Sequence, residues 1–211
     1  MLVSTVLNAF PASGLYAVTP DIAVEAQLLI DSVRAVIAGG AGVVQYRAKS
    51  RQDEVVAAQL LAVCREAGIP LIINDNIVLA QKIGADGVHL GKDDMPVSQA
   101  RKLLGASAIV GASCYDSLER AAEASAQGAD YLAFGRFFPS QTKPLAPCAN
   151  PATLSVARSL FNAPIVAIGG ITAANGADLI AAGAGLLAVV DGVFGQKNPE
   201  QAARSILSLF R

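Results

Sequence analysis

Short apolar stretches of four or five residues recur along the chain, each preceded by a turn and followed by a polar or glycine-rich loop. Short apolar runs bounded by turns are typical of strands that are covered on both faces. The pattern therefore predicts eight strands, at Leu15–Val18, Val43–Tyr46, Leu71–Asn74, Gly87–Leu90, Ile109–Ala112, Tyr131–Phe134, Ile165–Ile168 and Leu186–Val190.

Segments with the apolar spacing of a helix separate these strands. Between Asp53 and Ala67, for example, Val56, Leu60 and Val63 fall on one helical face. Further helices are expected over Ser117–Gln127 and Asn175–Ala182. Glycines that could close a helix in the left-handed conformation are Gly39, Gly68, Gly84, Gly128 and Gly183.

The alternation of strands and helices predicts the fold. Strands joined through helices pair in parallel by right-handed crossovers, and eight of them with none to spare close into a barrel. We therefore predict a (β/α)8 TIM barrel, a single domain over residues 1–211 with residues 1–13 as an N-terminal extension. An open doubly wound sheet is the alternative, but its Gly-x-Gly-x-x-Gly motif does not follow the first strand.

Composition narrows the functional classes. The chain is 53% hydrophobic and 16% charged, with a formal net charge of −1 and no basic or acidic block, which disfavours a nucleic-acid partner. No apolar run is long enough for a membrane span, and the first residues do not read as a signal peptide. Three widely spaced cysteines indicate reduced thiols. We expect a cytoplasmic protein that acts on small molecules, with a homo-oligomer left open.

Polar residues follow several predicted strands at the rim where active sites of such barrels lie. After the second strand, Gln45, Arg47 and Lys49 alternate onto one side of an extended chain. Two cations and an amide at this spacing suit a polyphosphate, and a solvated surface loop is an equally good interpretation of these residues alone.

Two carboxylates follow the third and fourth strands. Asp75 and Asp94 can converge because adjacent strands lie roughly 4.8 Å apart. Such a pair, completed by water and phosphate oxygens, is typical of Mg²⁺, whereas a single histidine and no cysteine pair disfavour zinc. Helix N-capping is the alternative for either aspartate.

The later strands contribute small residues and a long loop. Ser113 follows the fifth strand and could bind a heterocycle or cap a helix. The loop after the sixth strand, through Asn150, has the length of a lid. Glycine turns after the seventh and eighth strands suit a phosphate bound by backbone N–H groups. We expect no chemistry from His89, inside the fourth strand, or from Cys114, which has no evident base.

Five motifs occur in the order that the thiamine-phosphate synthase family shows, and from about Leu15 to Phe194 the chain resembles that family. These motifs are Gln-x-Arg-x-Lys at 45–49, Asn-Asp at 74–75, Gly-Val-His-Leu-Gly-x-x-Asp at 87–94, Ser-x-Thr-Lys at 140–143 and Ile-Gly-Gly-Ile-Thr at 168–172. The resemblance implies a Mg²⁺-dependent transferase that joins an aminomethylpyrimidine diphosphate to a thiazole phosphate and releases diphosphate.

The resemblance also implies site residues. The pyrimidine diphosphate would be bound by Gln45, Arg47, Lys49, Asn74, Ser113 and Lys143. Among these, Arg47, Lys49 and Lys143 are the catalytic candidates, and Asp75 and Asp94 would bind Mg²⁺. The thiazole phosphate would be bound by Ser140, Gln141, Thr142, Gly170, Val190 and Asp191.

Three departures from the family pattern and two alternatives remain. Lys92 and Asn76 occupy variable places near the metal and the diphosphate, and the loop from Leu145 to Ala149 lacks the glycine expected after Lys143-Pro144. Asp191 stands where members of the family often have a small residue, and a carboxylate there would repel a phosphate unless it turns away. A thiazole tautomerase on a related barrel would need a histidine base at the rim and no metal. A sensor of phosphate ligands would not need both Asp75 and Asp94.

Overall fold

Eight parallel strands close into one barrel in the order of the chain, which confirms the predicted (β/α)8 fold. The computed structural model describes residues 10–21, 25–49, 52–139 and 148–211. The strands are β1 (Gly14–Val18), β2 (Val43–Tyr46), β3 (Leu71–Asn74), β4 (Gly87–Leu90), β5 (Ile109–Tyr115), β6 (Tyr131–Gly135), β7 (Ile165–Ile168) and β8 (Leu186–Val189).

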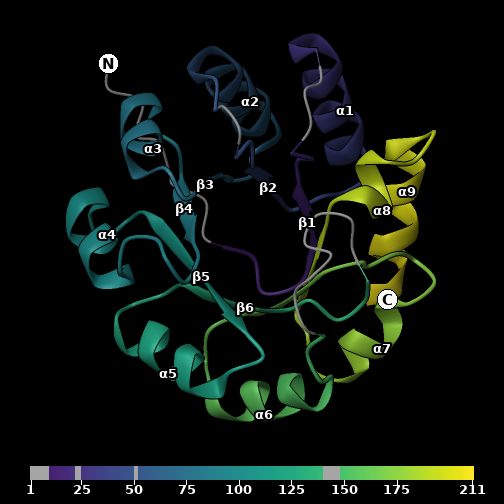
Figure 1. Cartoon of the computed structure of the whole chain (residues 1–211). Coiled ribbons are helices and arrows are strands. Elements are labelled where there is room, and N and C mark those ends of the chain that lie inside the picture. The colour runs from purple at the N-terminus through teal and green to yellow at the C-terminus, as the bar shows by residue number, and fades with distance from the viewer. Residues whose placement is uncertain (1–9, 22–24, 50–51, 140–147) are drawn as a thin grey trace.

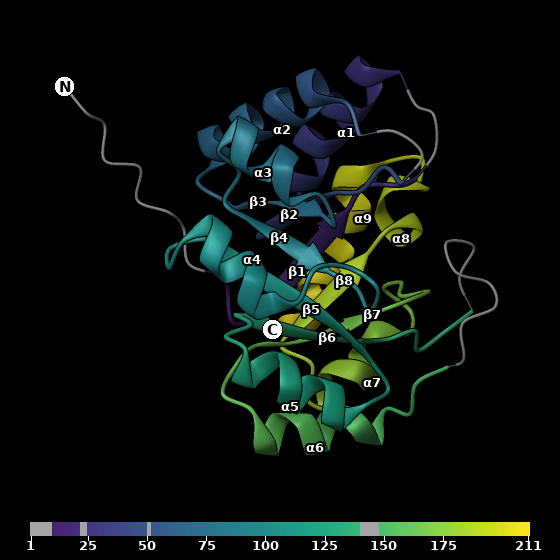
Figure 2. The same cartoon turned by 60° about the vertical axis from the view of Figure 1, so that its left-hand side comes forward.

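The helices form a ring around the strands (Figure 1). They are α1 (Ala26–Ala38), α2 (Glu54–Ala67), α3 (Ile77–Ile83), α4 (Val97–Leu104), α5 (Leu118–Ala126), α6 (Ala152–Leu160), α7 (Gly176–Ala181), α8 (Asp191–Phe194) and α9 (Pro199–Leu207), followed by the 3₁₀ turn η1 (Ser208–Phe210). A side view shows α1 to α3 and α5 to α6 on opposite sides of the strands (Figure 2). Within the described ranges, no helix has the length and apolarity to span a bilayer.

Alternation along each strand divides the side chains into two sets. One set, such as Val44 and Ile73, packs outward against the helices, and the other fills the barrel with residues such as Val43 and Ile72. The inward set continues upward from Val43 to Gln45. The same alternation that builds the core therefore also directs polar side chains into the barrel at the carboxyl ends of the strands.

The structure corrects two details of the predicted elements. Strand β5 extends to Tyr115 with an irregular register between Ser113 and Tyr115, so Ser113 lies inside the strand and not after it. Helix α1 ends at a right-handed Gly39, and the left-handed residue is Gly40. Gly68 and Gly84 do cap their helices in the left-handed conformation.

The base of the barrel contains an aromatic side chain that precedes β1. Phe10 stacks on Tyr131 with ring centroids 3.9 Å apart and meets Tyr16 edge-on. The described end of the predicted N-terminal extension is thus packed against the barrel interior.

Candidate active site

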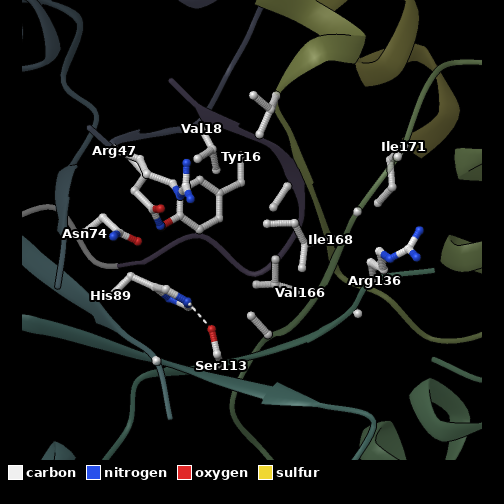
Figure 3. Close-up of a pocket in the computed structure, with 18 of the residues that line it drawn as sticks. Tyr16, Val18, Arg47, Asn74, His89, Ser113, Arg136, Val166, Ile168 and Ile171 are labelled. Carbon is white, nitrogen blue, oxygen red and sulfur yellow. Dashed lines mark hydrogen bonds between the residues drawn. The ribbon is translucent and has the colours of Figure 1, made fainter. Parts of the chain in front are cut away.

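A cavity of about 390 Å³ opens at the carboxyl ends of the strands. Every predicted site residue that the structure describes lines it: Gln45, Arg47, Lys49, Asn74, Asp75, Asp94, Ser113, Gly170, Val190 and Asp191. The other predicted site residues, Ser140, Gln141, Thr142 and Lys143, lie outside the described residues. Figure 3 shows Arg47, Asn74 and His89 on one side of the cavity and Ile171 and Arg136 across from them.

Arg47 is the most deeply placed cation of this cavity, with 8% of its surface exposed. Its Nη1 lies 3.1 Å from Oδ2 of Asp21, yet this ion pair lacks hydrogen-bond geometry, so within the described residues the buried Nη1 has no hydrogen-bond acceptor. Asp21 also accepts a 2.6 Å hydrogen bond from the Lys49 backbone N–H. A buried cationic donor without a hydrogen-bond acceptor favours an anionic ligand.

Lys49 connects this cation to the two predicted metal ligands. Its Nζ lies 3.3 Å from Oδ2 of Asp75. Burial, together with a hydrogen bond to Asp75, raises the pKa of Asp94, and Gly91 donates its N–H to Asp94 Oδ2 at 2.6 Å. The carboxylates of neighbouring strands therefore do converge, as predicted.

Asp75 has a left-handed backbone, with φ of 62°. This conformation is unfavourable for a residue with a side chain and is found where surrounding structure imposes it, often at functional sites. The N–H of Asp75 donates to the carbonyl of His89 at 2.9 Å. This hydrogen bond holds Asp75 beside β4, which Asp94 follows in the chain.

Neither aspartate caps a helix, which removes the alternative interpretation of this pair. Helix α2 is capped by Asp53, and α3 is capped by Asn76, whose side chain accepts from the Leu79 N–H. Helix α4 begins after Pro96 with no side-chain cap.

The carboxylate pair fits a Mg²⁺ ion. Across the described part of the chain, no third His, Cys, Asp or Glu joins the two to form a protein cage. Mg²⁺ prefers oxygen ligands and commonly keeps waters and substrate phosphates in its shell, so two carboxylates suffice. Three carboxylates, of Asp21, Asp75 and Asp94, face the cations of Arg47 and Lys49, and a divalent ion would reverse that excess of negative charge.

The opposite side of the cavity is built from glycine backbone. Gly169 and Gly170 have φ of 107° and 64°, and a Cβ on Gly170 would lie 2.3 Å from the Pro139 carbonyl oxygen. Close packing under the β6 loop thus requires glycine here, whether or not a ligand binds. Among the described residues, the N–H of Gly170 has no acceptor, which leaves it available to a phosphate.

Asp191 begins the short helix α8 with an exposed side chain that lines the cavity. Its carbonyl accepts from Gln196 Nε2 at 2.9 Å. Asp191 thus lines the cavity with an exposed carboxylate on the side of the glycine turns, where it would repel a phosphate.

Two residues without an expected role differ in their surroundings. His89 lines the cavity wall, where Nε2 lies 2.8 Å from Ser113 Oγ and Nδ1 lies 2.9 Å from the Tyr131 hydroxyl (Figure 3). Cys114 is buried, and this burial raises the pKa of its thiol to about 12. A thiol in that state is a poor nucleophile.

The sequence interpretation gave no role to five polar side chains of the cavity region: Tyr16, Asp21, Tyr115, Arg136 and Gln196. Tyr16 lies in the middle of a predicted strand, where an aromatic residue is expected in the core. Tyr115 comes after the predicted end of a strand. Asp21 is an isolated acid beyond a Thr-Pro pair. Only Arg136, directly after β6, carried a usable signal, namely a cation at a strand end.

Together, a parallel barrel, buried cations beside a carboxylate pair, and glycine turns after β7 and β8 define a barrel enzyme for phosphorylated ligands. Residues 15–193 match the family model described as thiamine monophosphate synthase. The chain is 52% identical to a thiamine-phosphate synthase of Methylococcus capsulatus, with 95% of this chain and 91% of that protein covered. It is 48% identical to one of Thiobacillus denitrificans, with 97% of both covered.

A solved structure agrees. The thiamine phosphate pyrophosphorylase of Pyrococcus furiosus superposes with a TM-score of 0.82 at 31% identity, covering 93% of this chain and 94% of that one. The chain belongs to the thiamine monophosphate synthase family, which is a family of transferases. The predicted family is thereby confirmed, and the thiazole tautomerase alternative is not favoured.

Proposed function

We propose that the rim cavity binds a pyrimidine diphosphate on its β2–β4 side and a thiazole phosphate on its β7–β8 side, and joins them to thiamine phosphate. The observation that carries this proposal is the meeting of Arg47, Lys49, Asp75 and Asp94 in one cavity, opposite the glycine turns.

The reaction breaks one bond and forms another. The C–O bond between the pyrimidine methylene and the diphosphate breaks, and the thiazole nitrogen donates its lone pair to form the new C–N bond. Charge accumulates on the departing diphosphate, so the largest contribution of the protein is electrostatic. The buried Nη1 of Arg47 supports this role, because it has no hydrogen-bond acceptor among the described residues.

Lys49 acts with the carboxylate pair. Its Nζ contacts Asp75 in this structure, and its ammonium group binds the diphosphate beside the carboxylates of Asp75 and Asp94, which would hold Mg²⁺. Mg²⁺ held there would supply positive charge to the leaving group. Gln45, Asn74 and, from the sequence alone, Lys143 complete this subsite, and Ser113 contacts the pyrimidine.

The glycine side anchors the second substrate. The backbone N–H groups of Gly170, Val190 and Asp191 bind the thiazole phosphate, with Ser140, Gln141 and Thr142 assigned from sequence alone. Anchoring the phosphate orients the thiazole nitrogen toward the methylene carbon, which replaces a bimolecular encounter with a positioned one. No protein nucleophile is required, which agrees with the protonated state of Cys114.

The test compares Asp75→Ala with Asp93→Ala. Asp93 is the exposed carboxylate that directly precedes Asp94. Purified protein, Mg²⁺ and both substrates are mixed, and thiamine phosphate and diphosphate are measured. We expect Asp75→Ala to abolish metal-dependent turnover with an unchanged circular dichroism spectrum, and Asp93→Ala to retain it. Near-normal turnover in Asp75→Ala would refute the metal assignment. Ligand binding without any product in the unmodified protein would indicate a sensor, and rearranged thiazole without coupling a tautomerase.

A further inference from the structure

Five polar side chains form a continuous row across the barrel interior. Gln45 Nε2 donates to the Tyr16 hydroxyl at 2.8 Å, and the hydroxyls of Tyr16 and Tyr131 lie 2.7 Å apart. The row continues from Tyr131 to His89 Nδ1 at 2.9 Å and from His89 Nε2 to Ser113 Oγ at 2.8 Å. It thus joins side chains of β1, β2, β4, β5 and β6.

Both ends of the row line the cavity, and only its central member does not. Gln45, Tyr16, His89 and Ser113 line the cavity, whereas Tyr131 is fully buried beneath it. The ring of Tyr131 occupies the space that a Cβ on Gly111 would need, since the nearest ring atom would lie 1.9 Å away. Gly111 therefore makes room for Tyr131 to reach His89, and Phe10 stacks on the same ring.

The two tyrosines have one proton each to donate. Burial raises the pKa of both Tyr16 and Tyr131 well above the usual value, so both hydroxyls stay protonated. A phenol hydroxyl donates one hydrogen bond and can accept others.

If each hydroxyl uses its single proton within the row, every bond has one direction. Tyr16 accepts from Gln45, and its own proton then goes to Tyr131. Tyr131 in turn donates to His89 Nδ1, which is then an acceptor, and the single proton of a neutral imidazole sits on Nε2. Nε2 donates to Ser113 Oγ, so the Ser113 proton is left to point toward the cavity.

We propose that Tyr16, Tyr131 and His89 form a one-directional hydrogen-bond relay that fixes His89 as the Nε2–H tautomer and presents the Ser113 hydroxyl to the ligand as a donor. This inference rests on the proposed function, in which Ser113 contacts the pyrimidine. The heterocycle atom facing Ser113 is then an acceptor, such as a ring nitrogen with a free lone pair. His89 and Tyr131 are positioning residues that act through Ser113.

The tautomer can be observed directly because His89 is the only histidine of the chain. The full-length protein is labelled with ¹⁵N-histidine, and its imidazole nitrogens are recorded by long-range ¹H–¹⁵N correlation at neutral pH without substrates. We expect a protonated Nε2 and an unprotonated Nδ1. The reverse tautomer, which a flipped Gln45 amide would impose, or an averaged mixture of both, would overturn the relay. This readout does not depend on turnover, so it can fail while the proposed function stands.

A hydroxyl deletion tests whether the relay acts through Ser113. Tyr131→Phe keeps the ring that stacks on Phe10 and removes the donor to His89. We expect loss of the single-tautomer signal and about a tenfold rise in KM for the pyrimidine diphosphate, with KM for the thiazole phosphate unchanged. Tyr46→Phe is the matched control, because the Tyr46 hydroxyl also makes a hydrogen bond, which is part-buried and comes from the Asp53 N–H, but this side chain packs against the helices.

A double variant then tests Ser113 and Tyr131 together. In a Ser113→Ala background, Tyr131→Phe should have almost no further effect on kcat/KM, since the relay has lost the group it positions. Fully additive losses of kcat/KM, or an unchanged His89 spectrum in Tyr131→Phe, would show that Tyr131 is only part of the barrel core. Either result would contradict the proposal.

Discussion

The two sides of the cavity differ in the groups that they offer to a phosphate. The β2–β4 side uses charged side chains, with Arg47, Lys49 and Asp75 linked to one another or to Asp21 by ion pairs. The β7–β8 side offers backbone, and its glycines are held by close contact with the β6 loop. Side-chain charges can exchange partners when a ligand arrives, whereas backbone N–H groups stay where packing puts them. This difference suits a departing diphosphate on the β2–β4 side and a phosphate that stays bound on the β7–β8 side.

The largest effect is expected on the charged side, from Arg47→Ala. If Arg47 binds the leaving diphosphate as proposed, loss of its buried guanidinium should lower kcat/KM about 10³-fold, and Arg47→Lys should recover only part of it because the planar fork is lost. Steady-state kinetics with the pyrimidine diphosphate varied provide the measurement.

Arg34→Ala serves as the control for this prediction. Arg34 pairs with Glu66 on the exposed surface, and such pairs contribute little. Equal losses in the Arg34 and Arg47 variants would mean that general destabilisation, and not charge at the cavity, explains the effect.

On the backbone side, Gly170→Ala should lower kcat/KM for the thiazole phosphate about 10²-fold, since one misdirected donor costs this much in comparable sites. The new Cβ would press on the Pro139 carbonyl and shift the turn. Binding of inorganic diphosphate, measured by calorimetry, should stay unchanged.

Gly68→Ala is a close match for this variant. Gly68 has φ of 70°, against 64° for Gly170, but a Cβ there meets nothing within 4 Å. It carries the same backbone strain, about 1 kcal/mol, without the contact or the cavity. If both variants retained full activity, the glycine turn after β7 would be a tight turn with no role in phosphate binding.

The sequence predicts some features of this cavity and not others. Features set by local patterns could be predicted. The alternation of Gln45, Arg47 and Lys49 and the acids after β3 and β4 are local features, and they located the charged side correctly. Period-two alternation decides which face a side chain takes, and parallel closure brings strand ends together.

Partnerships across the barrel could not be predicted in this way. Tyr16 and Tyr131 are 115 residues apart and each reads as an ordinary strand residue, so nothing local indicates that their hydroxyls meet. Asp21 pairs with Arg47 across a separation of 26 residues, and the left-handed φ of Asp75 depends on β4 holding its N–H. These features depend on closure of the barrel, which a local pattern does not contain.

A smaller effect should follow from removing the anion that faces Arg47. Asp21→Asn keeps an acceptor for the Lys49 N–H and removes a negative charge beside the diphosphate subsite. Binding of inorganic diphosphate should tighten about fivefold, as a repulsion of about 1 kcal/mol predicts for charges several ångströms apart. Calorimetry measures it, with Asp31→Asn on the exposed face of α1 as control. Weaker binding would instead mean that Asp21 chiefly orients Arg47.

The smallest effect is expected at the one acid of the backbone side, Asp191. If only its N–H serves the thiazole phosphate, its exposed carboxylate repels that ligand, and Asp191→Asn should lower KM about threefold, more at low salt than at high salt. Initial rates at two ionic strengths measure this. Asp178→Asn, on the exposed surface of α7 and away from the cavity, should leave KM unchanged. A raised KM in Asp191→Asn would show that this side also binds through a side chain, and the contrast between the two sides would no longer hold.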